Sequence, residues 1–167
     1  HRSDTEAVFC LQEAVFMEKV TTCKRATFAQ VDRQGVKELL QALPYYRCIE
    51  SLTLDKFECS NETFMQLCEW LEDRLKENAL TELVIRFGAK NGDQEHLIVK
   101  ALAKVLPVNR SLTRLHLDLG RGYGAFPLEL SCQALSEALG ANATLYDVDL
   151  LEEGFWQFFE RELGLKR

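Results

Sequence analysis

The stretches that decide the fold are Leu80-Thr-Glu-Leu83-Val-Ile85 and Leu112-Thr-Arg-Leu115-His-Leu117, with apolar residues at the first, fourth and sixth positions. The same pattern occurs in Ile49-Glu-Ser-Leu52-Thr-Leu54 and Leu145-Tyr-Asp-Val148-Asp-Leu150, so the four copies begin 31, 32 and 33 residues apart. Alternating apolar and polar residues are typical of a strand with one buried face. We therefore expect short strands at a regular spacing, which indicates a repeat architecture.

Helical patterns fill the segments between these strands. Apolar residues return every three or four positions in 64–75, 97–106 and 132–139, and a further helix is expected to end at Leu43, before the first of these strands. Each unit is therefore a strand, a loop and a helix.

An asparagine stands shortly before each of the last three strands, at Asn78, Asn109 and Asn142. Asn tolerates the left-handed backbone conformation that commonly ends a helix. We expect these residues to stop the helices in that way.

The Leu-x-x-Leu-x-Leu strands, the Ala- and Leu-rich helix 99–106 and the joint Asn109-Arg-Ser-Leu112 resemble leucine-rich repeats of the ribonuclease-inhibitor class. The resemblance covers residues 35–151. It implies an α/β solenoid, a short horseshoe with parallel strands inside and helices outside, which recognises a macromolecule with its inner face and needs no cofactor. The family usually has Asn or Cys at the ninth motif position. This chain departs from that pattern, with Phe57, Gly88, Gly120 and Glu153.

The two ends of such a stack must be covered, because each unit buries its apolar face only against a neighbour. We expect residues 1–34 to form an N-terminal helical cap, opened by the capping box Ser3-Asp-Thr-Glu6, with residues 23–28 adding an irregular first strand. Residues 35–151 hold the repeats. Residues 152–167, rich in Phe and Trp, are expected to form a C-terminal capping helix, or alternatively an exposed docking patch or homodimer surface.

The residues between the large apolar positions are expected to face the concave surface, about 4.8 Å apart from strand to strand. Three columns of side chains result: Ser51, Glu82, Arg114 and Asp147; Thr53, Val84, His116 and Asp149; and Asp55, Arg86, Asp118 and Leu151. We expect Arg86 to be neutralised by Asp55 and Asp118, and Arg114 by Glu82 and Asp147. Cross-strand ion pairs on a solvated face would account for these columns without any partner.

Catalytic chemistry finds little support in these columns. His116 beside Asp149 is the only candidate pair, and the nearest hydroxyls, Ser51 and Thr53, are expected two strands away. Asp147 and Asp149 alone fall short of the six or more oxygens that calcium takes. We therefore expect no enzyme activity, no metal and no cofactor.

The glycine-rich segment Gly120-Arg-Gly-Tyr-Gly124 lacks the Gly-Lys-Ser/Thr ending and the direct passage into a helix that a phosphate-binding loop has. We interpret it as a long rim loop. Its Arg121 and Tyr123 are residue types that often anchor protein interfaces, and residues 87–93 form a second loop on the same rim.

The composition argues against several partners. The 167 residues carry 20 Lys and Arg against 26 Asp and Glu, for a net charge of −6, and the excess acid lies beyond residue 48. Nucleic acid and membrane surfaces are therefore not expected to bind. No uncharged run reaches the roughly 18–20 residues of a membrane span. Three N-x-S/T sequons, at Asn61, Asn109 and Asn142, would matter only in a secreted protein.

The six cysteines follow no metal-binding or redox spacing and lie among apolar residues. We expect them to be buried reduced thiols, which favours a cytoplasmic location; paired cysteines would instead indicate secretion.

These observations predict a non-enzymatic protein-interaction scaffold, monomeric or weakly dimeric, that binds a protein through its concave strands and rim loops. The alternatives are a regulator of a small GTPase, similar to activator proteins of the same repeat class, or a ligand-sensing segment of a larger receptor or effector. The predicted partner-binding residues are Arg86, Arg114, His116, Asp118, Tyr146, Asp147 and Asp149 on the inner face and Arg121 and Tyr123 on the rim.

Overall fold

The computed structural model describes residues 15–87, 92–118 and 128–150; of residues 92–93 and 128–132 it describes the backbone only. Residues 15–22 are helical. The elements that follow are β1 (Arg25–Ala29), α2 (Arg33–Ala42), the 3-10 helix η1 (Leu43–Tyr45), β2 (Ser51–Asp55), α3 (Asn61–Lys76), β3 (Glu82–Arg86), α4 (Gly92–Val105), β4 (Arg114–Asp118), α5 (Leu128–Ala141) and β5 (Asp147–Leu150).

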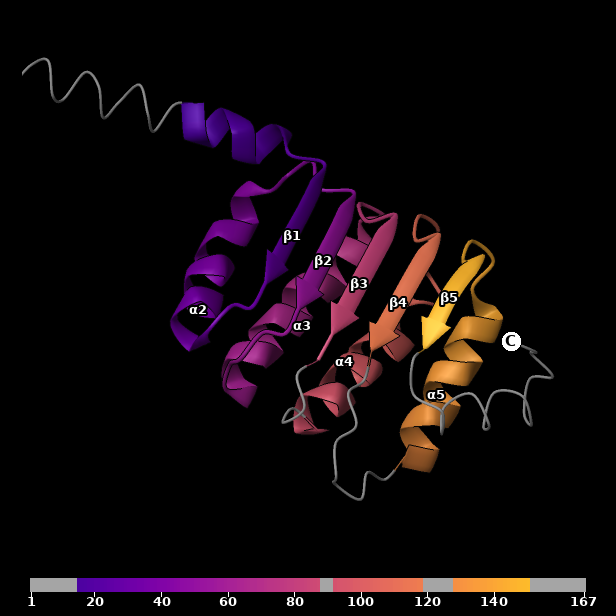
Figure 1. The fold of residues 1–167 in the computed structure, drawn as a ribbon. Coiled ribbons are helices and arrows are strands. Elements are labelled where there is room, and N and C mark those ends of the chain that lie inside the picture. The colour runs from indigo at the N-terminus through magenta and orange to yellow at the C-terminus, as the bar shows by residue number, and fades with distance from the viewer. Residues whose placement is uncertain (1–14, 88–91, 119–127, 151–167) are drawn as a thin grey trace, which may run out of the picture.

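The five strands form one parallel sheet whose spatial order is the chain order, β1 to β5. The strands lie side by side in one row and the helices run alongside them in a second row (Figure 1). This confirms the predicted α/β class with parallel strands. Within the described ranges, no helix combines the length and the apolar character that crossing a bilayer requires.

The register places the repeated apolar positions next to one another. Leu52 pairs with Leu83, Leu83 with Leu115, and Leu115 with Val148, and the next inward position aligns Leu54, Ile85, Leu117 and Leu150 in the same way. In β2, β3 and β4 these side chains are 0–1% exposed. Burying a Leu or Ile side chain fully stabilises a fold by about 1.5–3 kcal/mol. The two inward layers, packed against the helices, are therefore the centre of the core.

The asparagines before the strands act through their side chains. Asn109 is fully buried; its Nδ2 donates to the Leu75 carbonyl at 2.6 Å, and its Oδ1 accepts from the backbone N–H groups of Ser111 and Leu112. Asn142 repeats this one unit later, donating to the Leu106 carbonyl at 2.7 Å. Each amide thus ties the end of the previous helix to the entry of its own strand.

The expected left-handed conformation occurs at Asn78 alone of these three residues, with a φ of 55°. The prediction was wrong for Asn109 and Asn142. Their backbone N–H groups bond to carbonyls at the end of their own helices, Val105 for Asn109 and Ala138 for Asn142, without a left-handed residue. The side-chain hydrogen bonds occupy the Asn109 and Asn142 amides, so their sequons have no free nitrogen for a sugar in the folded chain.

Aromatic rings pack together where the family pattern has Asn or Cys. Phe57 is 3% exposed, stacks on Phe64 with ring centroids 5.5 Å apart, and lies 5.4 Å from Phe87. Apolar packing therefore helps to close the turn after β2, together with a side-chain hydrogen bond in which Gln94 Nε2 donates to the Cys59 carbonyl at 2.8 Å.

The N-terminal region contributes a strand to the sheet as well as helix. β1, within the segment predicted as a cap, pairs with β2 in a regular parallel register from Arg25–Ser51 to Ala29–Asp55. It is therefore more regular than expected for residues 23–28. Two expectations concern segments outside the described residues: that residues 1–14 complete the N-terminal cap and that residues 152–167 form the C-terminal capping helix. Both remain predictions.

We predict that Asn109→Ala lowers the free energy of unfolding by about 2–4 kcal/mol, because it leaves the N–H groups of Ser111 and Leu112 without their acceptor and removes one donor from the Leu75 carbonyl. Urea denaturation followed by circular dichroism measures this change. Lys100→Ala, at an exposed position of α4, is the control and should change stability by less than about 0.5 kcal/mol. Equal effects of the two substitutions would contradict the role of the Asn109 amide.

Candidate functional site

The outward-facing residues of the strands form the three predicted columns, and β1 extends each of them by one residue. The register aligns Arg25, Ser51, Glu82, Arg114 and Asp147; Thr27, Thr53, Val84, His116 and Asp149; and Ala29, Asp55, Arg86 and Asp118. We call these residues the inner wall. Acidic and basic side chains alternate along the first column, as in Glu82, Arg114 and Asp147, and along the third. Such a surface has no extended field of one sign.

Arg114 lies between two carboxylates, as predicted. Its guanidinium is 3.7 Å from Glu82 and 3.6 Å from Asp147, and its side chain is 53% exposed. A side-chain hydrogen bond with Tyr146, together with the nearby negative charges of Glu82 and Asp147, raises the pKa of Arg114. Arg114 therefore stays charged and is held by neighbours from two adjoining strands.

Glu82 connects this cluster to the other end of the sheet. It accepts a hydrogen bond from Ser51 Oγ at 2.8 Å, and Arg25 reaches past Ser51 to within 3.8 Å of it. The small side chain of Ser51 leaves room for this contact between β1 and β3. One chain of ionic and hydrogen-bonding contacts thus crosses all five strands.

His116 and Asp149 form the second predicted contact, with Nδ1 and Oδ2 3.0 Å apart. The pair lies on β4 and β5, whereas Ser51 and Thr53 lie on β2, two strands from His116. A histidine–carboxylate pair needs a nucleophile or a metal to act on. Within the part of the chain that the structure describes, no three His, Cys, Asp or Glu residues are grouped in a way that could hold a metal ion.

The third column holds Asp55, Arg86 and Asp118 in the predicted alignment. Within the described ranges, however, Arg86 forms no ion pair with the carboxylate of Asp55 or of Asp118. One oxygen of Asp55 is buried without a hydrogen-bond partner among the described groups. Register fixes Cα positions but not the rotamer of a long Arg side chain, so this alignment does not by itself form ion pairs, and the neutralisation of Arg86 stays a prediction.

Tyr146 precedes β5 and is 74% exposed, the largest exposed fraction among the large hydrophobic residues of the described chain. It adds an aromatic ring beside the Arg114 cluster. The predicted rim residues Arg121 and Tyr123, the last column member Leu151 and most of the loop after β3 lie outside the described residues.

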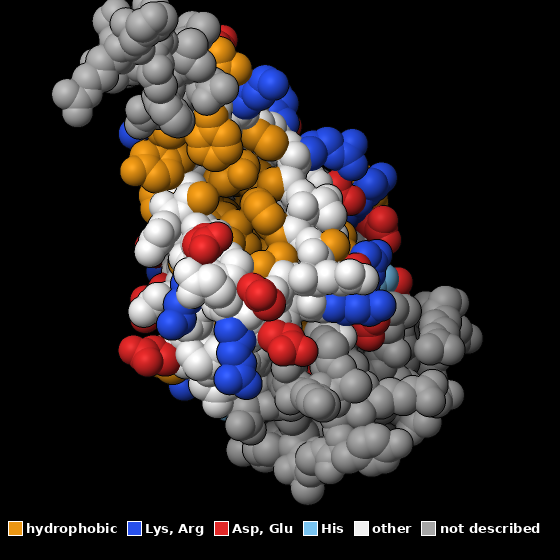
Figure 2. Space-filling model, turned by 60° about the vertical axis from the view of Figure 1, so that its left-hand side comes forward, with side chains coloured by type: hydrophobic (Ala, Val, Ile, Leu, Met, Phe, Trp, Pro, Cys, Tyr) orange, Lys and Arg blue, Asp and Glu red, His pale blue; other side chains and the backbone are white. Residues whose placement is uncertain are grey.

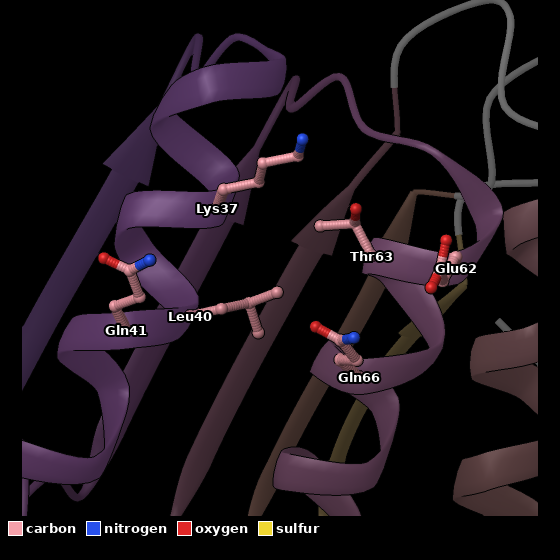
Figure 3. Close-up of a pocket in the computed structure, with 6 residues that line it drawn as sticks. All are labelled: Lys37, Leu40, Gln41, Glu62, Thr63 and Gln66. Carbon is pink, nitrogen blue, oxygen red and sulfur yellow. The ribbon is translucent and has the colours of Figure 1, made fainter.

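A groove between α2 and α3 was not expected from the sequence. It has a volume of about 410 Å³ and is lined by Lys37, Leu40, Gln41, Glu62, Thr63 and Gln66. Figure 3 shows Lys37 and Leu40 extending from α2 toward α3, and Thr63 and Gln66 extending from α3 toward α2. The only sequence signal is the polar character of both facing sides, which is also typical of solvated helices.

The described cysteines are unpaired: Cys23, Cys48, Cys59 and Cys68 are free. Burial raises the pKa of Cys59 to about 11 and, with a smaller contribution from neighbouring acidic groups, that of Cys68 to about 12. The expected burial holds for Cys68, is partial for Cys23 and Cys59, and was wrong for Cys48, which is exposed.

No family model matches the chain, and no curated protein matches it.

We predict that iodoacetamide at pH 8 alkylates Cys48 at least a hundredfold faster than Cys68, because Cys48 is accessible and the buried Cys68 keeps its proton. Peptide mapping by mass spectrometry after timed quenching gives both rates. In urea the two rates should become similar. A Cys68 rate equal to that of Cys48 in the native protein would show that this side of α3 is not packed as described.

Proposed function

We propose that the chain is a leucine-rich repeat solenoid of the ribonuclease-inhibitor type and acts as a non-enzymatic scaffold that binds a protein through the inner wall. The architecture is supported by strand–loop–helix units of 31 to 33 residues, stacked in chain order, whose repeated apolar positions are buried in β2, β3 and β4. A repeat stack of this kind presents one extended wall to a partner.

The observation that carries the binding proposal is the cluster of Arg114, Tyr146, Asp147 and Glu82. It combines an exposed aromatic ring with an Arg held between carboxylates, and Tyr and Arg are favoured anchors of protein interfaces. Because its ion pairs are solvent-exposed, they contribute little to folding and can be exchanged for contacts with a partner. His116 and Asp149 extend this polar surface along β4 and β5.

The partner can be identified by placing the photo-crosslinker p-benzoylphenylalanine at position 146 and, as a control, at position 65. Both Tyr146 and Met65 are exposed, but Met65 lies on α3, in the helix row. The proposal expects a protein that crosslinks from position 146 and not from position 65. Its affinity for the purified chain can then be measured by isothermal titration calorimetry.

We predict that the double charge reversal Arg114→Glu with Asp147→Lys weakens this affinity at least about tenfold and leaves the circular dichroism spectrum unchanged. The control, Glu69→Lys with Lys100→Glu, also preserves net charge and changes exposed helix residues. Unaltered affinity in the inner-wall variant would reject the proposed surface.

The same reagents separate the alternative function. If the crosslinked partner is a small GTPase, its GTP turnover should be measured with and without the chain. A scaffold leaves the rate unchanged, whereas a GTPase regulator changes it.

A further inference from the structure

Strand β1 is the first strand of the sheet, and among the described strands it pairs with β2 alone, so its other edge has no neighbouring strand. The Lys24 carbonyl accepts from Glu50 and Ser51, and the Gln30 N–H donates to Asp55, so residues 24 and 30 point their backbone groups toward β2. Backbone groups alternate in direction along a strand. The N–H and C=O groups of Arg25, Thr27 and Ala29 therefore point away from the sheet, toward the free edge. The Arg25 carbonyl there accepts from Cys23 Sγ at 3.1 Å, a weak donor that a strand N–H can replace.

The side chains beside this edge are also incompletely covered. Ala26 and Phe28, the inward residues of β1, are only partly buried, whereas the matching residues of β2, β3 and β4 are 0–1% exposed. Tyr46 contacts Phe28 edge-on at 5.9 Å, and neighbouring Tyr45 is 48% exposed. Figure 2 shows a continuous apolar area toward the N-terminal end of the described chain.

We propose that a second copy of the chain covers this edge, with the two β1 strands paired antiparallel about a two-fold axis at Thr27. In this register Thr27 faces its own counterpart, and Arg25 faces Ala29 of the second copy. All three residues that point toward the free edge then fall in hydrogen-bonded pairs, in which both partners exchange N–H···O bonds. A register centred one residue away, on Ala26 or Phe28, would set only two of these three residues opposite each other.

The side chains suit this self-pairing. Ala26 of one copy faces Phe28 of the other on the inward side, so that a small residue meets a large one at both positions. The two Arg25 side chains lie at opposite ends of the paired segment, roughly 13 Å apart along it, beyond the Debye length of about 8 Å at physiological ionic strength. The edge also lacks proline, which many proteins use to block such pairing.

The flank of helix α2 that faces away from α3 carries small residues, and Val31 packs against Gly35 there. Lys37 and Gln41 line the groove toward α3, so at 100° per residue Gly35 and Ala42 fall on the opposite flank. Because the two-fold axis is perpendicular to the sheet, the helices of both copies stay on the same face. The dimer would therefore carry two inner walls on one side, and it does not depend on what those walls bind.

The test is sedimentation velocity of the full chain from micromolar to hundreds of micromolar concentrations. We expect a reversible dimer. Thr27→Lys should weaken it at least about tenfold, because it places two like charges opposite each other at the axis. Thr53→Lys is the matched control: it adds the same charge in the same column, one strand further from the edge, and should leave dimerisation nearly unchanged.

Hydrogen exchange gives a residue-level readout of the same contact. The amides of Arg25, Thr27 and Ala29 should be protected at concentrations that favour the dimer and should lose protection on dilution or in the Thr27→Lys variant. Each of three results would overturn the proposal: a monomer at every concentration, a dimer weakened equally by both lysine variants, or a monomer that dimerises only after residues 1–14 are deleted. The last result would mean that the chain's own N-terminal residues cover the edge.

Discussion

The in-register burial of two aliphatic side chains from each central strand is the constraint on which the rest of the structure depends. Leu52, Leu83 and Leu115 form one buried row, and the residues two positions later form the next. Because side chains alternate between the two faces of a strand, a slip of one residue would expose both rows and bury the polar columns. The same requirement that fixes the core therefore fixes which side chains stand next to one another on the inner wall.

This dependence explains how much could be predicted from the sequence. The positions of the strands and the columns followed from the apolar pattern, and the Arg114 and His116 contacts followed from the columns. The Arg86 contacts did not, because ion pairing depends on side-chain rotamers that register does not determine. The role of Asn109 was missed for a related reason: its residue type suits both a left-handed backbone and a side-chain cap, and only the observed hydrogen bonds distinguish the two.

The joints between units complement the apolar rows. The Asn109 and Asn142 amides each link one helix end to the next strand, and the hydroxyls of Ser111 and Thr144 donate to carbonyls one unit back, of Leu80 and Leu112. These bonds satisfy backbone groups that neither the helix nor the sheet can pair. Helix α2 has less support from its neighbour, since a groove separates it from α3. The apolar pattern of the sequence predicts helix α2 but carries no signal for its distance from α3.

The inner wall and the helix row therefore serve different purposes, one in the proposed binding and the other in folding. The helix row supplies the apolar cover that holds the strands in place, while the wall carries exposed charges whose mutual contacts add little stability. A surface of that kind is positioned rigidly by the core beneath it and remains available to a partner. The alignment of its residues is set by the backbone rather than by the ion pairs themselves.

The most direct test of this alignment is an NMR measurement of inter-strand contacts in isotope-labelled protein. Parallel pairing in the described register predicts amide-to-α-proton Overhauser effects that link the Thr53 region to Val84, and the Val84 region to His116, across 31 and 32 residues of sequence. Overhauser effects offset by one residue, or their absence between these strands, would contradict the account of both the core and the inner wall.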